Sequence, residues 1–224
     1  MKLPREIPVM ILPNATLFPQ ALLPLYIFEP RYRQMLVDAL ETHRLFAIAM
    51  QKPGQTRETP APVAGLGLIR VAVTHKDETS HLILQGIARV ELGQTVRYKP
   101  YRVQRIFPLA TPPSDTAAVD ALLIQVRELL KERIALGLPF PFPVVSAKSP
   151  GKDVTPSFSP KEIFGYLDSL TDPEQTADLV SCAVLPGGVE RQAILETIDV
   201  ESRLRRLIQF LVAEIRNKRK GGKL

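Results

Sequence analysis

The sequence predicts an α+β fold, with an N-terminal β-barrel that contains one inserted helix and a C-terminal α-helical bundle. Residues 1–110 hold many short apolar runs separated by proline, glycine and polar turns, a pattern typical of strands. Residues 111–224 instead repeat their apolar residues at helical spacing. The 21 prolines favour short elements, and a hydrophobic content of 45% is ample for a packed core.

The segment from Ile7 to Phe28 contains no charged residue and four prolines, which argue against a membrane-spanning helix. We expect two short strands, 9–12 and 25–28, each apolar enough to be buried on both faces. A helix is expected to begin at Pro30, because a proline at the first helical position loses no hydrogen bond. Its apolar face is formed by Tyr32, Met35, Leu36, Ala39 and Leu40.

The remaining strands are expected at 45–50, 64–74, 81–85, 87–97 and 101–109. Two glycines in the second of these predict a bent or bulged strand. A polar hairpin tip lies at 75–80, and Gly86 is expected to separate the two strands around it. A closed or partly open barrel leaves the fewest exposed strand edges for so many short strands.

The helical part is expected to comprise residues 111–224, with clear signals at the helix ends. A first helix should end at Gly137, a suitable C-terminal cap. Ser159-Pro160-Lys161-Glu162 is a capping box that predicts the second helix. Asp172 precedes the third, a short helix is expected at 189–196, and Asp199 caps a long last helix.

A proline-rich loop at 138–160 contains six prolines and three phenylalanines. A loop of this length inside a compact domain is either functional or disordered. One interpretation is a semi-rigid arm that presents Phe140 and Phe142 to a partner or a second subunit. The other, which we favour, is that these two rings cover the end of the helical bundle.

The net charge of +6 is concentrated at the C-terminal end. Residues 216–224 form a basic tail with five positive charges and no acid, so the remainder is close to neutral. Such a tail can contact nucleic acid or an acidic partner. A solvated, frayed end is the commoner outcome and is what we expect.

Several motifs resemble the N-terminal domain of Lon protease. In the first part they are Leu12-Pro13, Phe18-Pro19, Leu23-Pro24-Leu25, Ile27-Phe28-Glu29-Pro30-Arg31-Tyr32, Gly65-x-Gly67 and Gly86-x-x-Arg89. In the helical part they are Asp172-Pro173, Ala177-Asp178, Ile194-Leu195-Glu196 and Asp199-Val200-x-x-Arg203-Leu204. The resemblance covers most of the chain but not the proline-rich loop. It implies a PUA-like β-barrel, a fold that RNA-binding domains also use, in a stand-alone form of the substrate-binding domain.

Catalytic machinery is not expected. Lon proteases add an ATPase and a Ser-Lys peptidase module, and neither fits this sequence. The nearest phosphate-loop pattern, 149–153, lacks the earlier glycine and the hydroxyl after its lysine. Ser146 and Lys148 lie in the proline-rich loop without an evident pocket. His75, His81 and Asp77 are too few for a zinc site on rigid elements, so we expect no metal and no cofactor.

The location expected from the sequence is cytoplasmic. The N-terminus lacks the continuous apolar stretch and cleavage site of a secretory signal. The single Cys182 cannot form an internal disulfide and is expected to be a small buried residue. No membrane partner is expected, and a homo-oligomer is left open.

The function expected from this resemblance is a binding module rather than an enzyme. It implies binding of exposed apolar polypeptide segments, or of a partner protein, in a groove between barrel and helices. Phe28, Glu29, Arg31 and Tyr32 are the candidate residues for this contact, together with Phe140 and Phe142. Glu29 and Arg31 are expected to fix the helix start, whereas Phe28 and Tyr32 more often belong to a core. The alternative is RNA or other nucleic-acid binding through the barrel and the basic tail.

Overall fold

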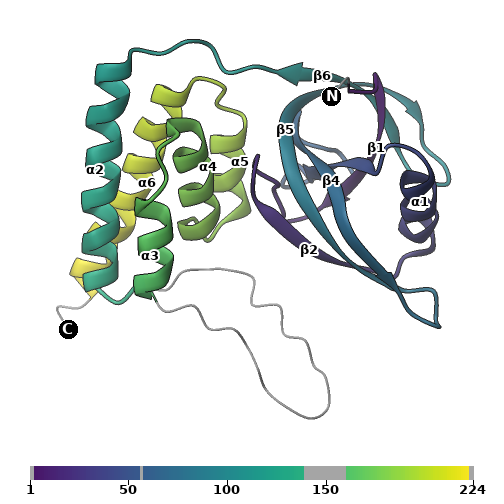
Figure 1. Ribbon diagram of the computed structural model, residues 1–224, viewed down its shortest axis with the longest axis horizontal. Coiled ribbons are helices and arrows are strands. Elements are labelled where there is room, and N and C mark those ends of the chain that lie inside the picture. Colours follow the sequence, from purple (N-terminus) through teal and green to yellow (C-terminus); the bar gives the residue numbers. More distant parts are fainter. Residues whose placement is uncertain (1–2, 56–57, 139–159, 222–224) are drawn as a thin grey trace. The chain divides into compact units, whose positions relative to one another are not determined.

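The computed structural model describes residues 3–55, 58–138 and 160–221, which divide into two compact units. The first comprises Met1–Ala110 with Gly187–Glu196, and the second Thr111–Pro186 with Thr197–Leu224. The described strands lie in the first unit together with some of the helices, and the remaining helices form the second unit (Figure 1). The short helix near residue 190 was expected in the helical part, but it belongs to the unit of the strands.

Six strands form one sheet in the described part of the first unit. They are β1 (Glu6–Leu12), β2 (Leu22–Ile27), β3 (Leu45–Met50), β4 (Val63–Thr74), β5 (Ser80–Arg97) and β6 (Val103–Leu109). Their order is β2-β5-β4-β3-β1-β6, and an additional pairing of β5 with β6 closes five of them into a barrel. Among the described strands, only β1 and β3 pair in parallel. Helix α1 (Pro30–Glu41) follows β2, so the α+β fold with one inserted helix is confirmed.

Strand β5 differs from the prediction because it continues through Gly86 without a break. Its residues up to Gln85 pair with β2 and β4, residues 89–91 pair with both β4 and β6, and the last residues pair with β6. The predicted irregularity of the neighbouring strand is confirmed, since the β4–β5 register shifts between Leu66 and Gly67 and again between Ile69 and Val71. Gly86 therefore does not end the strand, and a Cβ atom at its position would be 1.9 Å from the Phe18 carbonyl oxygen.

Helix α5 (Gly188–Leu195) is held against the strands by side chains from both sides. Arg89, which is 4% exposed, donates from Nε to the Leu195 carbonyl at 3.1 Å. Gln192 donates from Nε2 to the Val63 carbonyl at 2.8 Å. These hydrogen bonds explain why α5 belongs to the compact unit of the barrel although it lies far along the chain.

The described part of the second unit contains four helices: α2 (Thr116–Ala135), α3 (Pro160–Asp168), α4 (Pro173–Val184) and α6 (Val200–Gly221). The predicted caps are confirmed at Asp172, which accepts from the Glu174 N–H, and at Asp199, which accepts from the Ser202 N–H. Gly137 follows α2 with a positive φ of 65°. None of the helices in the described ranges is both long and apolar enough to cross a membrane.

The predicted frayed tail is wrong for residues 216–221, which continue helix α6. Arginine and lysine are good helix formers, so a basic stretch can prolong a helix without adding apolar residues that would mark it. Residues 222–224 lie outside the described part of the chain. The cations of the tail are therefore mostly displayed on a helix surface.

Candidate functional site

The outward side of strands β2, β5 and β4 carries a group of exposed apolar side chains, which we call the outer apolar face. Its members expose between 38% and 59% of their surface. They are Leu22, Tyr26, Phe28, Val71, Val73 and Ile83. Scattered exposed apolar residues are ordinary, but a contiguous group of them on a protein surface typically marks a binding site.

The strand register places these side chains next to one another, because β5 pairs with β2 on one side and with β4 on the other; the three strands are labelled in Figure 1. Ile83 of β5 lies between Pro24 of β2 and Val71 of β4. In the next outward row, His81 lies between Tyr26 and Val73. Directly opposed residues of paired strands have neighbouring Cβ atoms, so the two rows form one continuous surface.

Strand alternation explains why this surface exists. Leu23, Leu25 and Ile27 point inward and pack in the core cluster beneath α1. Leu22, Tyr26 and Phe28 fall on the opposite side because successive side chains of a strand alternate. The prediction that this strand is buried on both faces is therefore wrong for its outer side, whereas Val9, Met10 and Ile11 of β1 are all buried.

An aromatic row crosses the outer apolar face from its edge towards the β4–β5 hairpin. The rings of Phe28 and Tyr26 are stacked with centroids 5.8 Å apart, and the Tyr26 and His81 centroids are 4.8 Å apart. His81 in turn shares a hydrogen bond with His75, between Nδ1 and Nε2, at 2.8 Å. Because these rings restrain one another, they offer contact area that is already ordered.

Strand β2 forms an edge of the sheet, since β5 is its only partner among the described strands. An exposed edge could in principle accept a further strand from another chain. Pro24 in the middle of β2 has no N–H to donate, and a proline within a sheet normally turns that position towards the free edge. Contact through the side chains of the outer apolar face is thus better supported than strand addition.

The residues predicted for the site divide between this face and other positions. Phe28 lies on the outer apolar face and is 58% exposed, so its expected place in the core is wrong. Tyr32 is 5% exposed and packs inward, with its hydroxyl 3.4 Å from both the amide and the carbonyl of Ile11. Burial raises the pKa of the Tyr32 phenol. Phe140 and Phe142 lie outside the described residues.

Glu29 and Arg31 form an ion-pair network with Glu58 next to the start of α1. Arg31 donates from Nε to Glu29 at 2.9 Å and from both Nη atoms to Glu58 at 2.8 and 2.6 Å. The hydrogen bonds to Arg31 lower the pKa of Glu58, and those to Glu58 raise the pKa of Arg31. Because its donors are engaged, Arg31 fixes local structure, in agreement with the expected role at the helix start.

The sequence pattern missed Tyr26, Leu22, Ile83, Val71 and Val73. Each of these residues is apolar and lies in a predicted strand, so it was indistinguishable from a core residue. The available signal was that both alternating sets of residues in 22–28 are apolar. Such a strand needs a second covering layer, and an outer set without one is a candidate contact surface.

A metal site in the described residues would need a group of His, Cys, Asp or Glu side chains that lie close together. Across residues 3–55, 58–138 and 160–221, no three His, Cys, Asp or Glu side chains come close enough together to hold a metal ion. His75 and His81 do lie together, as their sequence positions suggested, but they bond to each other.

The sequence matches the family described as the ATP-dependent protease La (LON) substrate-binding domain over residues 6–213. It is 23% identical to a Lon protease of Desulfosudis oleivorans over 100% of this chain and 26% of that protein. It is 25% identical to a Lon protease of Phenylobacterium zucineum over 95% of this chain and 25% of that protein. The chain thus spans about a quarter of the length of these relatives.

Solved structures show the same fold. The N-terminal domain of Mycobacterium avium complex Lon protease superposes with a TM-score of 0.69 at 18% identity, covering 92% of this chain and 98% of that one. A Lon N-terminal domain protein from Xanthomonas campestris gives a TM-score of 0.50 at 18% identity, covering 91% and 97%.

Proposed function

The chain belongs to the family of ATP-dependent protease La (LON) substrate-binding domains, and we propose that it holds polypeptide segments with exposed apolar side chains. The observation that carries this proposal is the outer apolar face, a continuous group of apolar side chains on three neighbouring strands. The proposal concerns polypeptide binding and not the activity of the whole relatives, because they are about four times longer than this chain.

Because the outer apolar face is mainly apolar, we expect it to bind a polypeptide by burying apolar side chains of both partners, with little selectivity for the sequence of that polypeptide. Covering a large apolar side chain is worth about 1.5–3 kcal/mol, and this term is not directional. His81 is the polar member of the two rows, and beside them Leu22 is paired with Gln85, which accepts a hydrogen bond from Arg70. Unfolded or partly unfolded chains expose apolar side chains that folded proteins bury, so they are the ligands that this surface suits.

The test is binding of a permanently unfolded protein, reduced and carboxymethylated, measured by fluorescence anisotropy. We expect Phe28→Ser and Ile83→Thr each to weaken binding about tenfold, because each removes roughly 1.4 kcal/mol of apolar contact. Both side chains are exposed in the free protein, so folding should persist, which circular dichroism would verify.

The matched control is Val37→Ser, which removes an equally exposed apolar side chain from α1 in the same unit but outside the face. It is expected to leave the dissociation constant unchanged. The proposal would be refuted if Phe28→Ser and Ile83→Thr bound the unfolded protein as tightly as the unaltered chain does. It would also be refuted if Val37→Ser lost as much affinity as those two variants. The family and the relatives give no support to the nucleic-acid alternative.

A further inference from the structure

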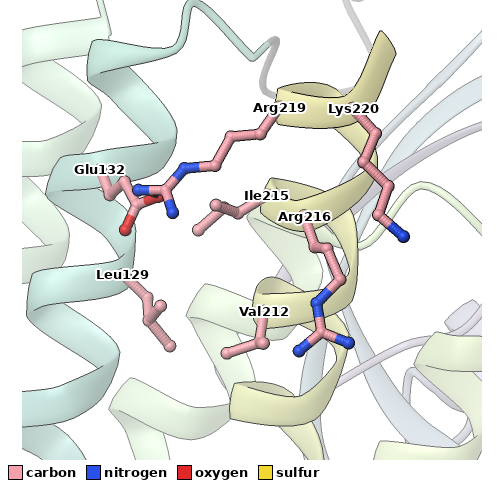
Figure 2. Close-up of a pocket in the computed structure, with 7 residues that line it drawn as sticks. All are labelled: Leu129, Glu132, Val212, Ile215, Arg216, Arg219 and Lys220. Carbon is pink, nitrogen blue, oxygen red and sulfur yellow. Dashed lines mark ion pairs between the residues drawn. The ribbon is translucent and has the colours of Figure 1, made fainter.

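A second surface feature lies in the helical unit, between α2 and the C-terminal part of α6. It is a groove of about 560 Å³. Figure 2 shows Leu129 of α2 and Val212 and Ile215 of α6 pointing into the space between the two helices. These three side chains give the groove an apolar floor.

The rim of the groove is basic. Arg219 extends across it and pairs with Glu132 of α2 at 2.7 Å (Figure 2). Arg216 and Lys220 flank the groove on α6, and within the described residues neither has an ion-pair partner. With one carboxylate and three cations, the rim carries a net charge of about +2.

The length of the groove fits a short helical segment. Val212 and Lys220 are eight residues apart on α6, which corresponds to about 12 Å or two helical turns. Two turns of a second helix present apolar anchors at positions i, i+3 or i+4 and i+7, the spacing by which an amphipathic helix binds between two others. Arg216 and Lys220 are one turn apart, so they match carboxylates spaced by four residues.

We propose that this groove docks an acidic amphipathic helix of a partner protein. Its apolar stripe covers Leu129, Val212 and Ile215, and its glutamates or aspartates pair with Arg216 and Lys220. Such docking pairs the two cations and removes the half-buried Leu129 and Val212 from water, whereas Ile215 is already buried. The groove belongs to the helical unit and is separate from the outer apolar face, so this proposal does not depend on the proposed function.

An acidic helix suits the groove better than a nucleic acid does. Proteins that bind single-stranded nucleic acid combine cations with aromatic side chains on which bases stack. The seven residues that line the groove include no aromatic one, and its floor is aliphatic. An aliphatic floor beside the cations of α6 is complementary to a ligand that is itself apolar and acidic.

The test uses the full chain and a synthetic helical peptide of about four turns, with leucines at the anchor spacing and glutamates beside them. Binding is measured by fluorescence anisotropy at about 0.15 M salt. We expect the unaltered chain to bind the peptide with micromolar affinity. The double variant Arg216→Glu, Lys220→Glu should bind it at least about tenfold more weakly. Affinity should recover when the double variant is given a peptide with lysine at each glutamate position. Glutamate is a good helix former, so α6 should persist in the variant.

Arg206→Glu is the matched control, because it reverses an exposed cation on α6 that does not line the groove. It should bind the acidic peptide as the unaltered chain does, and so should Phe28→Ser on the outer apolar face. Failure of the acidic peptide to bind would overturn the proposal, and so would unchanged binding in the double variant. The proposal would also be overturned if a single-stranded oligonucleotide or phosphatidylglycerol vesicles bound more tightly than the acidic peptide and lost that binding in the double variant.

Discussion

Two glycines of the barrel allow the loop between β1 and β2 to lie directly on the sheet. A Cβ atom on Gly65 would be 1.9 Å from the Leu17 carbonyl oxygen, and one on Gly86 would be 1.9 Å from that of Phe18. Both glycines contact backbone, which cannot rotate away as a side chain can. The loop can occupy this position only if both residues lack a side chain.

Replacement of Gly86 by alanine is therefore expected to destabilise the protein. The added methyl group must displace the Phe18 backbone, and inserting an extra carbon into a packed site typically costs about 1–3 kcal/mol. The free energy of unfolding in urea measures this loss. Gly165→Ala in α3 is the control, because nothing lies within 4 Å of its Cβ position. Alanine there should stabilise by about 0.5–1 kcal/mol. Equal stability of the two variants would contradict the expectation.

Residue types alone predicted some of these roles and not others. The inward packing of Tyr32 and the local role of Arg31 follow from their places in and beside the apolar stripe of α1. Phe28 and Tyr26 could not be distinguished from core residues, because a strand pattern shows which residues share a face but not whether anything covers that face. Exposure depends on the neighbouring elements, which a local pattern does not contain.

Helix ends were predictable because capping is a local property. Asp172, Asp199 and Gly137 each act within a few residues of their own position. The continuity of β5 through Gly86 was not predictable in this way. It depends on pairing with β2 and β4 and on the contact with Phe18, a residue far away in the sequence. In the sequence, a glycine that allows contact with a distant segment cannot be distinguished from a glycine that ends a strand.

Helices α4 and α6 are joined by a buried ion pair. Arg203, which is 0% exposed, donates from Nη1 to Asp178 at 2.7 Å, and its Nη2 contacts Thr111, Glu174 and the Ile198 carbonyl at 3.1–3.3 Å. Both Asp178 and Arg203 belong to the short motifs that carry the family resemblance. In this unit, those motifs encode packing of helices rather than a binding site.

Removal of one member of this pair is expected to cost more than removal of both. Asp178→Leu leaves the Arg203 guanidinium without its buried partner, which typically costs about 3–5 kcal/mol. The double variant Asp178→Leu, Arg203→Met replaces the pair by apolar contacts and should recover part of that loss. A double-mutant cycle on the free energy of unfolding measures the coupling. Additive effects of the two substitutions would show that the pair contributes no specific stabilisation.

The whole molecule is assembled from contacts between distant segments. Arg89 reaches Leu195 across 106 positions, and Gln192 reaches Val63 across 129. These bonds place α5 in the barrel unit, although the chain between them forms helices of the other unit. The sequence predicted the strand-rich and the helical architecture. It could not predict that a later segment returns to the barrel, because α5 carries an ordinary helical pattern.

We expect this chain to bind unfolded protein without cleaving it and without hydrolysing ATP. The matched family is a substrate-binding domain, and the nearest phosphate-loop pattern lacks the residues that hold nucleotide and magnesium. After incubation with ATP and carboxymethylated protein, we expect no phosphate release above the blank and no shortened fragments on a gel, while anisotropy still reports binding. A full-length Lon protease is the positive control. Hydrolysis that co-elutes with the chain and scales with its concentration would contradict a purely binding role.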